Sequence, residues 1–532
     1  MFADAVRRLT APGAEFETVT DPDTHLCRFA GTPRTLRDLL LQADPRKQLL
    51  WHDGRWWTVG EVADAAAELG TRLVEAHGVR PGDRVAILGH NSPAWVVAFF
   101  AATGVGAVAV PLNAWWSTDE LSWALHHAGA AVVVADRSLA QRIQVDAPVV
   151  VVDPAPGDEP RTGSWPAHCP LPTDLATILY TSGSSGTPKG VVSTNDSILQ
   201  AVWAFACRAA VEGGEDHEGP AVVTRTLLPV PLFHVTGCVG VLLGALRSGG
   251  EVVLMGRWDP VVALRLVGDL RITHVVGVPT QWGDLLGALD ATPADVSTLV
   301  RIGGGGAPAP PSLVRRLASV LGAGGVGIGY GMTETNGYGP VNSGADYLAN
   351  PDSSGRLVPI AEVEARDPDG RPVPPGAEGQ IWFRGPHLAS GYWHDDETRA
   401  ETWSEGWLRT GDLGTVDADG QVRVTGRLKE MILRGGENVA VAEVEAALFE
   451  HPAVREVAVL GVPDDRMGEA VAAVVVGRAG QALGSDELVE WLRGRIAGYK
   501  VPTRVRWSTE SLPRTASGKI ARARLRELLT EP

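Results

Sequence analysis

Residues 180–190 read Tyr180-Thr181-Ser182-Gly183-Ser184-Ser185-Gly186-Thr187-Pro188-Lys189-Gly190 and follow directly on the apolar stretch 176–179. Glycine lets consecutive backbone N–H groups turn toward a bound anion, because no side chain blocks the approach. The serine and threonine hydroxyls add hydrogen-bond donors, and Lys189 adds a compact positive charge. A Gly/Ser linker would need neither the apolar segment before the loop nor Val191-Val192 after it. The stretch therefore predicts a phosphate-binding loop.

The residues around the lysine exclude the Walker A type of phosphate loop. That motif places Gly-Lys-Ser/Thr at the start of a helix. Here Pro188 precedes Lys189, and β-branched residues follow shortly after it. We therefore expect the loop to lie between two extended segments and to bind phosphate with little help from a helix dipole.

Six further motifs follow this loop along the chain. They are Phe233-His234, Gly303-Gly304-Gly305-Gly306-Ala307-Pro308, Tyr330-Gly331-Met332-Thr333-Glu334-Thr335, Arg409-Thr410-Gly411-Asp412, Gly426-Arg427-Leu428-Lys429-Glu430 and Pro513-Arg514-Thr515-Ala516-Ser517-Gly518-Lys519-Ile520. Over nearly its whole length the chain thereby resembles the adenylate-forming (AMP-binding) superfamily of acyl-CoA synthetases, peptide-synthetase adenylation domains and beetle luciferases. The acyl-CoA synthetase or fatty-acid–CoA ligase branch fits best. The resemblance implies a ligase that uses ATP, Mg²⁺ and coenzyme A.

The length and patterning predict an α/β protein of more than one domain. A chain of 532 residues exceeds what one hydrophobic core usually supports. Short apolar segments, such as the strand expected at 84–88, alternate in the first two-thirds with helical patterns, such as the helix expected near 236–246, which predicts parallel sheets covered on both faces. Thr58 is expected to cap a helix that ends near residue 77, and Ser117 and Glu120 to form a capping box before a helix that ends near Gly129.

The pattern of predicted strands and helices changes in the last third of the chain. Strand and turn signals from about residue 355 predict a small antiparallel β-barrel, and an α/β mixture follows Gly426. We expect residues 1–428 to form a large N-terminal AMP-binding domain, with layered α/β sheets and the barrel. Residues 429–532 are expected to form a small, mobile α+β lid domain that turns about Lys429.

The composition indicates which binding partners and which cellular compartment the protein can have. A net charge of −16 argues against a general nucleic-acid-binding protein, whose binding surface would be basic. The four cysteines are far apart and form no metal-spaced pair, which favours a reduced, cytoplasmic protein. Residues 93–112 are apolar, but Gly104 and Gly106 interrupt them, so we interpret them as a buried helix and strand rather than a membrane span.

The resemblance assigns the nucleotide to particular residues. Those expected to bind ATP or AMP are Thr181, Ser182, Gly183, Ser184, Ser185, Gly186, Thr187, Lys189, Gly306, Ala307, Pro308, Tyr330, Gly331, Met332, Thr333, Asp412 and Arg427. In the family the residue at Tyr330 stacks on adenine, and the one at Thr333 contacts the α-phosphate. Asp412 accepts from the ribose hydroxyls with support from Arg427, and Glu334 holds Mg²⁺, a hard cation that uses few protein ligands.

Joining a carboxylate to ATP is difficult because both reactants are anions. A catalyst needs cations around the phosphates, alignment of the reacting atoms and exclusion of water. The resemblance implies Lys519, Thr181, His234 and Glu334 as catalytic residues, with Lys519 bridging the substrate carboxylate and the α-phosphate.

A second reaction must use the same site. The lid is expected to turn about Lys429, so that Lys519 leaves and Gly435-Gly436 line a channel for the pantetheine of coenzyme A. The expected acyl pocket comprises His234, Val235, Thr236, Gly304 and Gly305. The chain departs from common family patterns at Ala440-Val441 and Leu433, and neither departure removes a catalytic group.

The segment after His234 has no bulky aromatic residue, which favours an open, apolar acyl pocket. We expect a hydrophobic acid (fatty, aryl or terpenoid/steroid-side-chain), with Trp282 either shortening the pocket or belonging to the core. No obvious counter-ion for an amino acid's ammonium group is present. The alternatives are an adenylating enzyme that loads a carrier-protein pantetheine, a non-catalytic nucleotide sensor, and a luciferase. The sequence also allows a homodimer.

Overall fold

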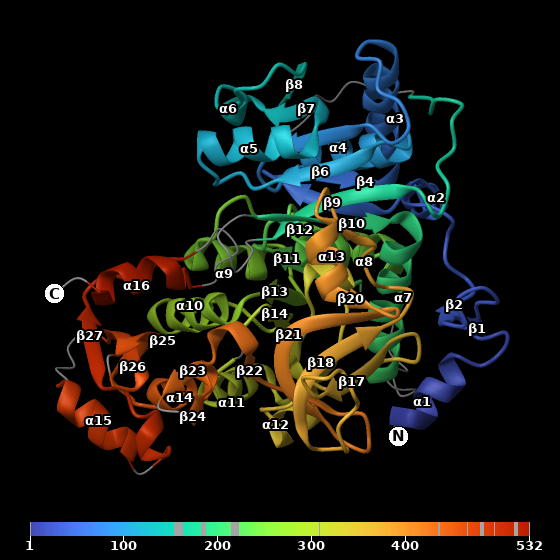
Figure 1. Cartoon of the computed structure of the whole chain (residues 1–532). Helices are drawn as coiled ribbons and strands as arrows, with labels where there is room; N and C mark the ends of the chain where they lie inside the picture. Colours follow the sequence, from blue (N-terminus) through green and yellow to red (C-terminus); the bar gives the residue numbers. More distant parts are fainter. Residues whose placement is uncertain are drawn as a thin grey trace.

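The computed structural model describes residues 2–153, 163–181, 188–213, 223–307, 309–434, 437–464, 466–478, 484–493, 495–514 and 520–530. This part of the chain forms two large sheets, an antiparallel barrel sheet and a C-terminal sheet (Figure 1). A short hairpin near the N-terminus, β1 (Thr18–Thr20) with β2 (Cys27–Phe29), follows helix α1 (Phe2–Leu9). The mixed α/β architecture confirms the predicted fold class.

The first large sheet has seven strands. In spatial order they are β19 (Gly391–Tyr392), β10 (Lys189–Thr194), β9 (Leu175–Thr181), β6 (Val108–Leu112), β5 (Arg84–Leu88), β7 (Ala130–Asp136) and β8 (Val149–Val152). The strands from β9 to β8 are parallel, whereas β10 and β19 add two antiparallel strands at one edge. The helices of this region are α2 (Leu36–Gln42), α3 (Val59–Glu75), α4 (Pro93–Gly104), α5 (Thr118–Ala128), α6 (Arg137–Ala140) and α7 (Asn195–Gly213).

Helix α4 is the interior of this layer, because every one of its residues is buried. It runs into strand β6, so the apolar stretch 93–112 is a buried helix and strand, as predicted. Among the described residues no helix is both long and apolar enough to cross a membrane.

The second large sheet has eight strands. In spatial order they are β16 (Val341–Ser343), β15 (Val326–Gly329), β14 (Arg301–Gly305), β13 (His274–Gly277), β11 (Arg225–Leu228), β12 (Glu251–Leu254), β3 (Gln48–His52) and β4 (Arg55–Thr58). The strands from β15 to β3 are parallel. The helices and turns of this region are α8 (Gly244–Ser248), α9 (Pro260–Asp269), α10 (Pro279–Ala291), α11 (Pro311–Leu321), η2 (Ala323–Gly325), η3 (Thr333–Thr335) and α12 (Gly344–Ala349).

Local sequence signals set the helix ends. Thr58 and Glu61 form a capping box at the start of α3, and Ser117 and Glu120 form one at the start of α5. Helix α5 ends at Gly129, which adopts the left-handed conformation that glycine accepts at low cost. Both predicted caps are confirmed.

One helix differs from its prediction. The segment expected as an α-helix near residues 236–246 begins as a π-helix, η1 (Thr236–Leu243), and continues as α8. Its first turn packs so closely that a Cβ on Gly237 would overlap the carbonyl oxygen of Pro231. Such wide turns often occur at functional sites, and apolar periodicity alone does not distinguish them from an α-helix.

The last third contains the two smaller sheets. The barrel sheet has β17 (Glu362–Arg366), β18 (Glu378–Arg384), β21 (Trp407–Val416), β20 (Trp403–Ser404) and β22 (Val422–Arg427), with helix α13 (Asp396–Thr402). The C-terminal sheet has β24 (Glu437–Val439), β23 (Ile432–Arg434), β26 (Gly468–Gly477), β25 (Val454–Asp464) and β27 (Arg504–Ser508). Its helices and turns are η4 (Leu428–Glu430), α14 (Val441–Phe449), α15 (Ser485–Arg493), η5 (Gly498–Lys500) and α16 (Arg522–Thr530). The antiparallel barrel sheet is confirmed, and the boundary at residue 429 stays a prediction.

The buried helix α4 generates a stability prediction. Phe99 is fully buried, and its ring stacks on Trp95 at a centroid distance of 5.6 Å. Phe99→Ala should lower the free energy of unfolding by about 3–5 kcal/mol, because it removes buried surface and leaves a cavity. The midpoint of the urea transition measures this loss. Val149→Ala, at an exposed position on β8, is the control, and equal midpoints for the two variants would contradict the assignment of α4 to the core.

Candidate active site

The predicted phosphate loop begins and ends on a β-hairpin. Thr181 closes strand β9, Lys189 opens strand β10, and the two residues are paired across the antiparallel ladder. Residues Ser182, Gly183, Ser184, Ser185, Gly186 and Thr187 lie outside the described residues. The prediction that the loop joins two extended segments is therefore confirmed at both of its ends.

Lys189 has neighbours that sequence reasoning did not anticipate. Its Nζ donates to the hydroxyl of Thr398 at 3.4 Å and lies 5.2 Å from the ring centroid of Tyr392. Tyr392 belongs to β19, which pairs with β10 as an added edge strand. These contacts hold the ammonium group beside the start of strand β10, where the phosphate loop ends.

Glu334 is a buried carboxylate, 6% exposed, in the turn η3. The hydroxyl of Tyr392 donates to its Oε1 at 2.8 Å. Burial raises the pKa of Glu334, although that hydrogen bond and the charges of Arg427 and Lys189 act in the opposite direction. A buried carboxylate of this kind is a suitable ligand for a hard cation, which would restore the charged form.

Neither Tyr392 nor Asn336 was predicted from the sequence as a site residue. Asn336 is buried and accepts from Ser193 Oγ at 2.8 Å, while its amide donates to the carbonyl of His387 at 3.0 Å. It therefore fastens the turn of Glu334 to strand β10. The Gly391-Tyr392-Trp393 string before an acidic helix start was the available signal for Tyr392, whereas a single asparagine gives none.

The predicted ribose residues meet in one cluster. Asp412 is paired with Arg427 across strands β21 and β22, and Arg427 Nε donates to its Oδ1 at 2.9 Å. The hydroxyl of Tyr330 donates to Oδ2 at 2.5 Å. Burial and the nearby charge of Asp412 raise the pKa of Tyr330 well above its usual range, so the phenol remains a donor. A carboxylate has about four acceptor positions, so ribose hydroxyls still find room.

The turn between Tyr330 and Glu334 approaches its neighbours closely. A Cβ on Gly331 would overlap the carbonyl oxygen of Gly337. Met332 N–H donates to the hydroxyl of Thr335 at 3.2 Å, and Thr333, like Met332, is partly exposed. The backbone of this turn is therefore fixed before any nucleotide binds.

The glycine-rich strand β14 has a structural reason for its composition. A Cβ on Gly304 would overlap the carbonyl oxygen of Gly277 in β13, and one on Gly305 would overlap that of Gly329 in β15. Gly306 and Ala307 follow the strand and are exposed, whereas Pro308 lies outside the described residues. Sheet packing thus requires these glycines in addition to any contact with a ligand.

Three of the predicted acyl-pocket residues, 234–236, lie at or just before the start of the π-helix, and the other two lie on β14. His234 and Thr236 are partly exposed, and Val235 is buried between them. The ring of Phe233 lies 5.1 Å from that of His234 and meets the edge of Trp115 at 5.2 Å. Trp282 is fully buried in the second core, so the open question about this residue is answered in favour of the core.

The lid residues are only partly described. Lys519, Gly435 and Gly436 lie outside the described residues, and Lys429 lies in the turn η4. Arg522 begins helix α16, just after the lysine loop, and pairs with Glu445 at 2.7 Å and with Glu430 at 3.5 Å. The segment that follows the predicted catalytic lysine is therefore tied to the predicted hinge.

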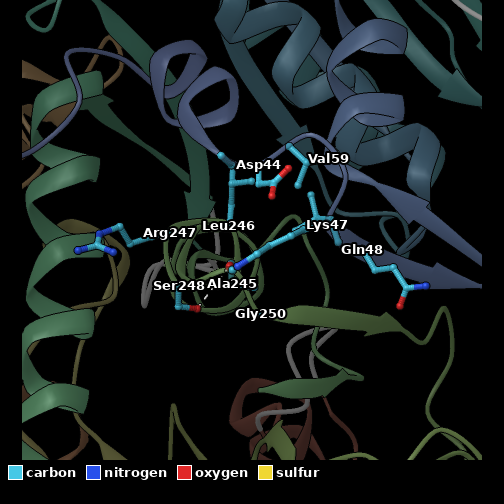
Figure 2. Close-up of a pocket in the computed structure, with 12 residues that line it drawn as sticks. Asp44, Lys47, Gln48, Val59, Ala245, Leu246, Arg247, Ser248 and Gly250 are labelled. Carbon is cyan, nitrogen blue, oxygen red and sulfur yellow. Dashed lines mark hydrogen bonds between the residues drawn. The ribbon is translucent and has the colours of Figure 1, made fainter. Parts of the chain in front are cut away.

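A separate cavity of about 170 Å³ lies outside this site (Figure 2). It is lined by residues that precede and begin β3 and by the end of α8, among them Asp44, Lys47 and Ser248. Lys47 extends toward the last turn of α8 in Figure 2. A cation there stabilises the C-terminal end of a helix, which is a structural role.

Comparison with known proteins agrees with this geometry. The AMP-binding enzyme model matches residues 40–393, and the AMP-binding enzyme C-terminal domain model matches residues 443–519. A feruloyl-CoA synthase of Amycolatopsis is 38% identical over 91% of this chain and 96% of its own length. A long-chain-fatty-acid–CoA ligase of Mycobacterium tuberculosis is 33% identical over 86% and 90%.

A solved structure extends the comparison to three dimensions. The o-succinylbenzoate CoA synthetase of Bacillus subtilis, in complex with its acyl-adenylate intermediate, superposes with a TM-score of 0.81 at 29% identity. The match covers 93% of this chain and 98% of that one. The chain therefore belongs to the AMP-binding enzyme family, as an AMP-forming acyl-CoA synthetase.

Proposed function

We propose that this acyl-CoA synthetase activates a hydrophobic carboxylic acid (fatty, aryl or terpenoid/steroid-side-chain). The carboxylate oxygen attacks the α-phosphorus of ATP, pyrophosphate leaves, and an acyl-adenylate forms. The thiolate of coenzyme A then attacks the acyl carbon, and AMP leaves as the thioester forms.

One continuous set of contacts carries this proposal. Lys189 lies against Tyr392, which donates to Glu334. The same turn contains Tyr330, which donates to Asp412, and Asp412 pairs with Arg427. Residues assigned to the phosphates, the metal ion, the adenine and the ribose are thus adjacent in space, although they are far apart in the sequence.

The polar groups of this set support particular roles. Lys189 and the loop beside it balance the charge of the phosphates, and Asp412 with Arg427 orients the ribose. Lys519 lies in the lysine loop and would neutralise the carboxylate and the α-phosphate as they meet. Glu334 would hold Mg²⁺, which when bound neutralises phosphate charge.

Three observations support a hydrophobic acid. The partly exposed ring of His234 lies 5.1 Å from that of Phe233, which in turn contacts Trp115. A Cβ on Gly240, one turn further along η1, would meet only Phe205, at 4.0 Å. The relatives named above act on aromatic and fatty acids, and coenzyme A is the acceptor in their names. A carrier-protein pantetheine is the alternative acceptor.

We also propose the division into residues 1–428 and 429–532, with Lys429 as the hinge. The salt bridges of Arg522 to Glu430 and Glu445 support it, because they join the start of α16, just after the lysine loop, to α14 and to the residue next to Lys429. A cytoplasmic location is supported by the cysteines, since all four are free thiols.

A panel of acids tests the function directly. With ATP and Mg²⁺, hydrophobic acids should support ATP–pyrophosphate exchange, and added coenzyme A should convert the adenylate to thioester and AMP. Parallel reactions with a phosphopantetheinylated carrier protein identify the acceptor. Exchange with amino acids or acetate alone would reject the proposed substrate class, and no exchange with any acid would reject the function.

The role of Lys519 separates the two half-reactions. Lys519→Ala should slow acyl-adenylate formation on the order of a hundredfold or more, because the charge that neutralises the meeting anions is lost. Thioester formation from supplied acyl-adenylate should stay close to the wild-type rate. Lys500→Ala, which removes a lysine paired with Glu443 in the same part of the chain, is the control. An equal loss in both steps would contradict the two-state lid.

The ribose cluster generates a binding prediction. Asp412→Asn keeps the shape of the side chain but removes its charge, so the dissociation constant of AMP should rise by about tenfold or more. Isothermal titration calorimetry measures it. Asp369→Asn, in an exposed turn, should bind AMP as the wild type does. An unchanged affinity in Asp412→Asn would exclude Asp412 as the ribose ligand.

A further inference from the structure

The segment that leads to His234 makes few backbone hydrogen bonds within itself. Residues 228–234 read Leu-Pro-Val-Pro-Leu-Phe-His, and the two prolines offer no backbone N–H. His234 N–H donates to the carbonyl of Pro231 at 3.1 Å, which forms a single turn. Backbone bonds inside the segment therefore fix only its last residues.

Asn91, from the loop that follows strand β5 of the first large sheet, supplies further bonds. Its Oδ1 accepts from Leu232 N–H at 2.7 Å. Its Nδ2 donates to the carbonyls of Val230 at 3.0 Å, Met255 at 3.1 Å and Leu228 at 3.3 Å. The side chain thus acts as a peptide group between the ends of β11 and β12, and it uses both the donor and the acceptor capacity of its amide.

Asn91 is itself held rigidly. It is 5% exposed and lies between strand β5 and the fully buried helix α4. The next residue, Ser92, caps α4 by accepting from Trp95 N–H, and Pro93 opens the helix. On its other side, His90 N–H donates to the buried carboxylate of Asp136 at 2.9 Å. The amide therefore projects from a loop whose two neighbouring residues are both held by hydrogen bonds.

The opposite side of the segment rests on an aromatic contact. The indole of Trp115 is 47% exposed and meets Phe233 edge-on at 5.2 Å. Phe233 thus contacts the half-exposed ring of Trp115, lies against His234, and directly follows the anchored residues 228–232. A displacement of the segment would carry both rings away from the acid site.

We propose that Asn91 is a positioning residue for the carboxylic acid: it fixes residues 228–232, and through them the rings of Phe233 and His234 at the mouth of the acyl pocket. This proposal rests on the proposed function, because it takes these rings as neighbours of the acid. It assigns a role in acid binding to a side chain in the loop between β5 and α4, remote in sequence from the pocket.

The loss of the amide would leave the N–H of Leu232 and the carbonyls of Val230 and Met255 in a buried place without their partner, whereas the carbonyl of Leu228 would keep its bond from Met255 N–H at 3.2 Å. Buried polar groups without partners are costly, so the segment would shift to reach water or other donors. The nucleotide cluster does not depend on Asn91, since Tyr330, Asp412 and Arg427 are joined through other strands. Acid binding should therefore respond while ATP binding does not.

The chain offers a matched control in Asn195, which is 2% exposed. Asn195 accepts from Leu36 N–H at 3.0 Å and donates to the carbonyls of Leu171 and Asp174 at 3.2 and 3.3 Å. It makes the same kinds of bond at the start of α7, and it braces helix α2 and the 171–174 segment. Asn195→Ala should lower stability as Asn91→Ala does, without acting on the acid.

The test compares Asn91→Ala, Asn195→Ala and wild type in acid-dependent pyrophosphate release, with the best acid of the panel. Asn91→Ala should raise the KM for the acid on the order of tenfold to a hundredfold, as a small misplacement of a positioning group does, and leave the KM for ATP at the wild-type value. In the double variant with His234→Ala, Asn91→Ala should add little, because both changes act through the same ring. Equal KM values in Asn91→Ala and Asn195→Ala, or a parallel rise for acid and ATP, would overturn the proposal.

A measurement on the wild-type enzyme covers the case in which Asn91→Ala does not fold. Hydrogen exchange of residues 228–234 should be slow before any acid is added, because Leu232 N–H is already bonded to Asn91. Fast exchange that only the acid suppresses would overturn the proposal, since the segment would then not be positioned in advance. A wild-type enzyme with no acid-dependent activity would instead reject the proposed function. The hydrogen-exchange result would then still decide whether residues 228–234 are ordered in advance.

Discussion

The site depends on keeping two carboxylates buried at the place where an anionic nucleotide binds. Removing a charge from water is costly unless hydrogen bonds or opposite charges compensate. In this protein each carboxylate receives a tyrosine hydroxyl: Tyr392 donates to Glu334, and Tyr330 donates to Asp412. A phenol satisfies an oxygen without cancelling the charge, so Asp412 still attracts Arg427. The turn that contains Tyr330 and Glu334 must therefore stay packed against β19, which carries Tyr392, and against β21, which carries Asp412. Both carboxylates depend on that packing to remain buried.

Much of this arrangement could be predicted from the sequence. Capping residues such as Thr58 and Ser117 determine helix starts by contacts within three residues, and those predictions are confirmed. Apolar segments such as 84–88 are confirmed as buried parallel strands. The motif residues Tyr330, Asp412 and Arg427 are neighbours in the structure, as the resemblance to the family implied for residues that bind one nucleotide, and their roles in binding it stay predictions.

The parts that could not be predicted depend on contacts between distant residues. Tyr392 and Glu334 are 58 positions apart, and Asn91 and Leu232 are 141 apart. No local pattern marks such pairs, since a tyrosine or an asparagine looks the same on any loop. The π-helix η1 was predicted as an α-helix because both patterns bury the same apolar residues. The glycines of β14 were assigned to ligand contact, and the sheet itself requires Gly304 and Gly305.

The pairing of β19 with β10 has a consequence for how the chain can be divided. Strand β10 would otherwise present a free row of N–H and C=O groups, which is a template for pairing with other molecules. The two residues that cover it, Gly391 and Tyr392, come from a point about two hundred positions later in the chain. A fragment that stops before them would expose that edge, so proteolysis or shortened expression products that end there should aggregate rather than persist as soluble half-enzymes.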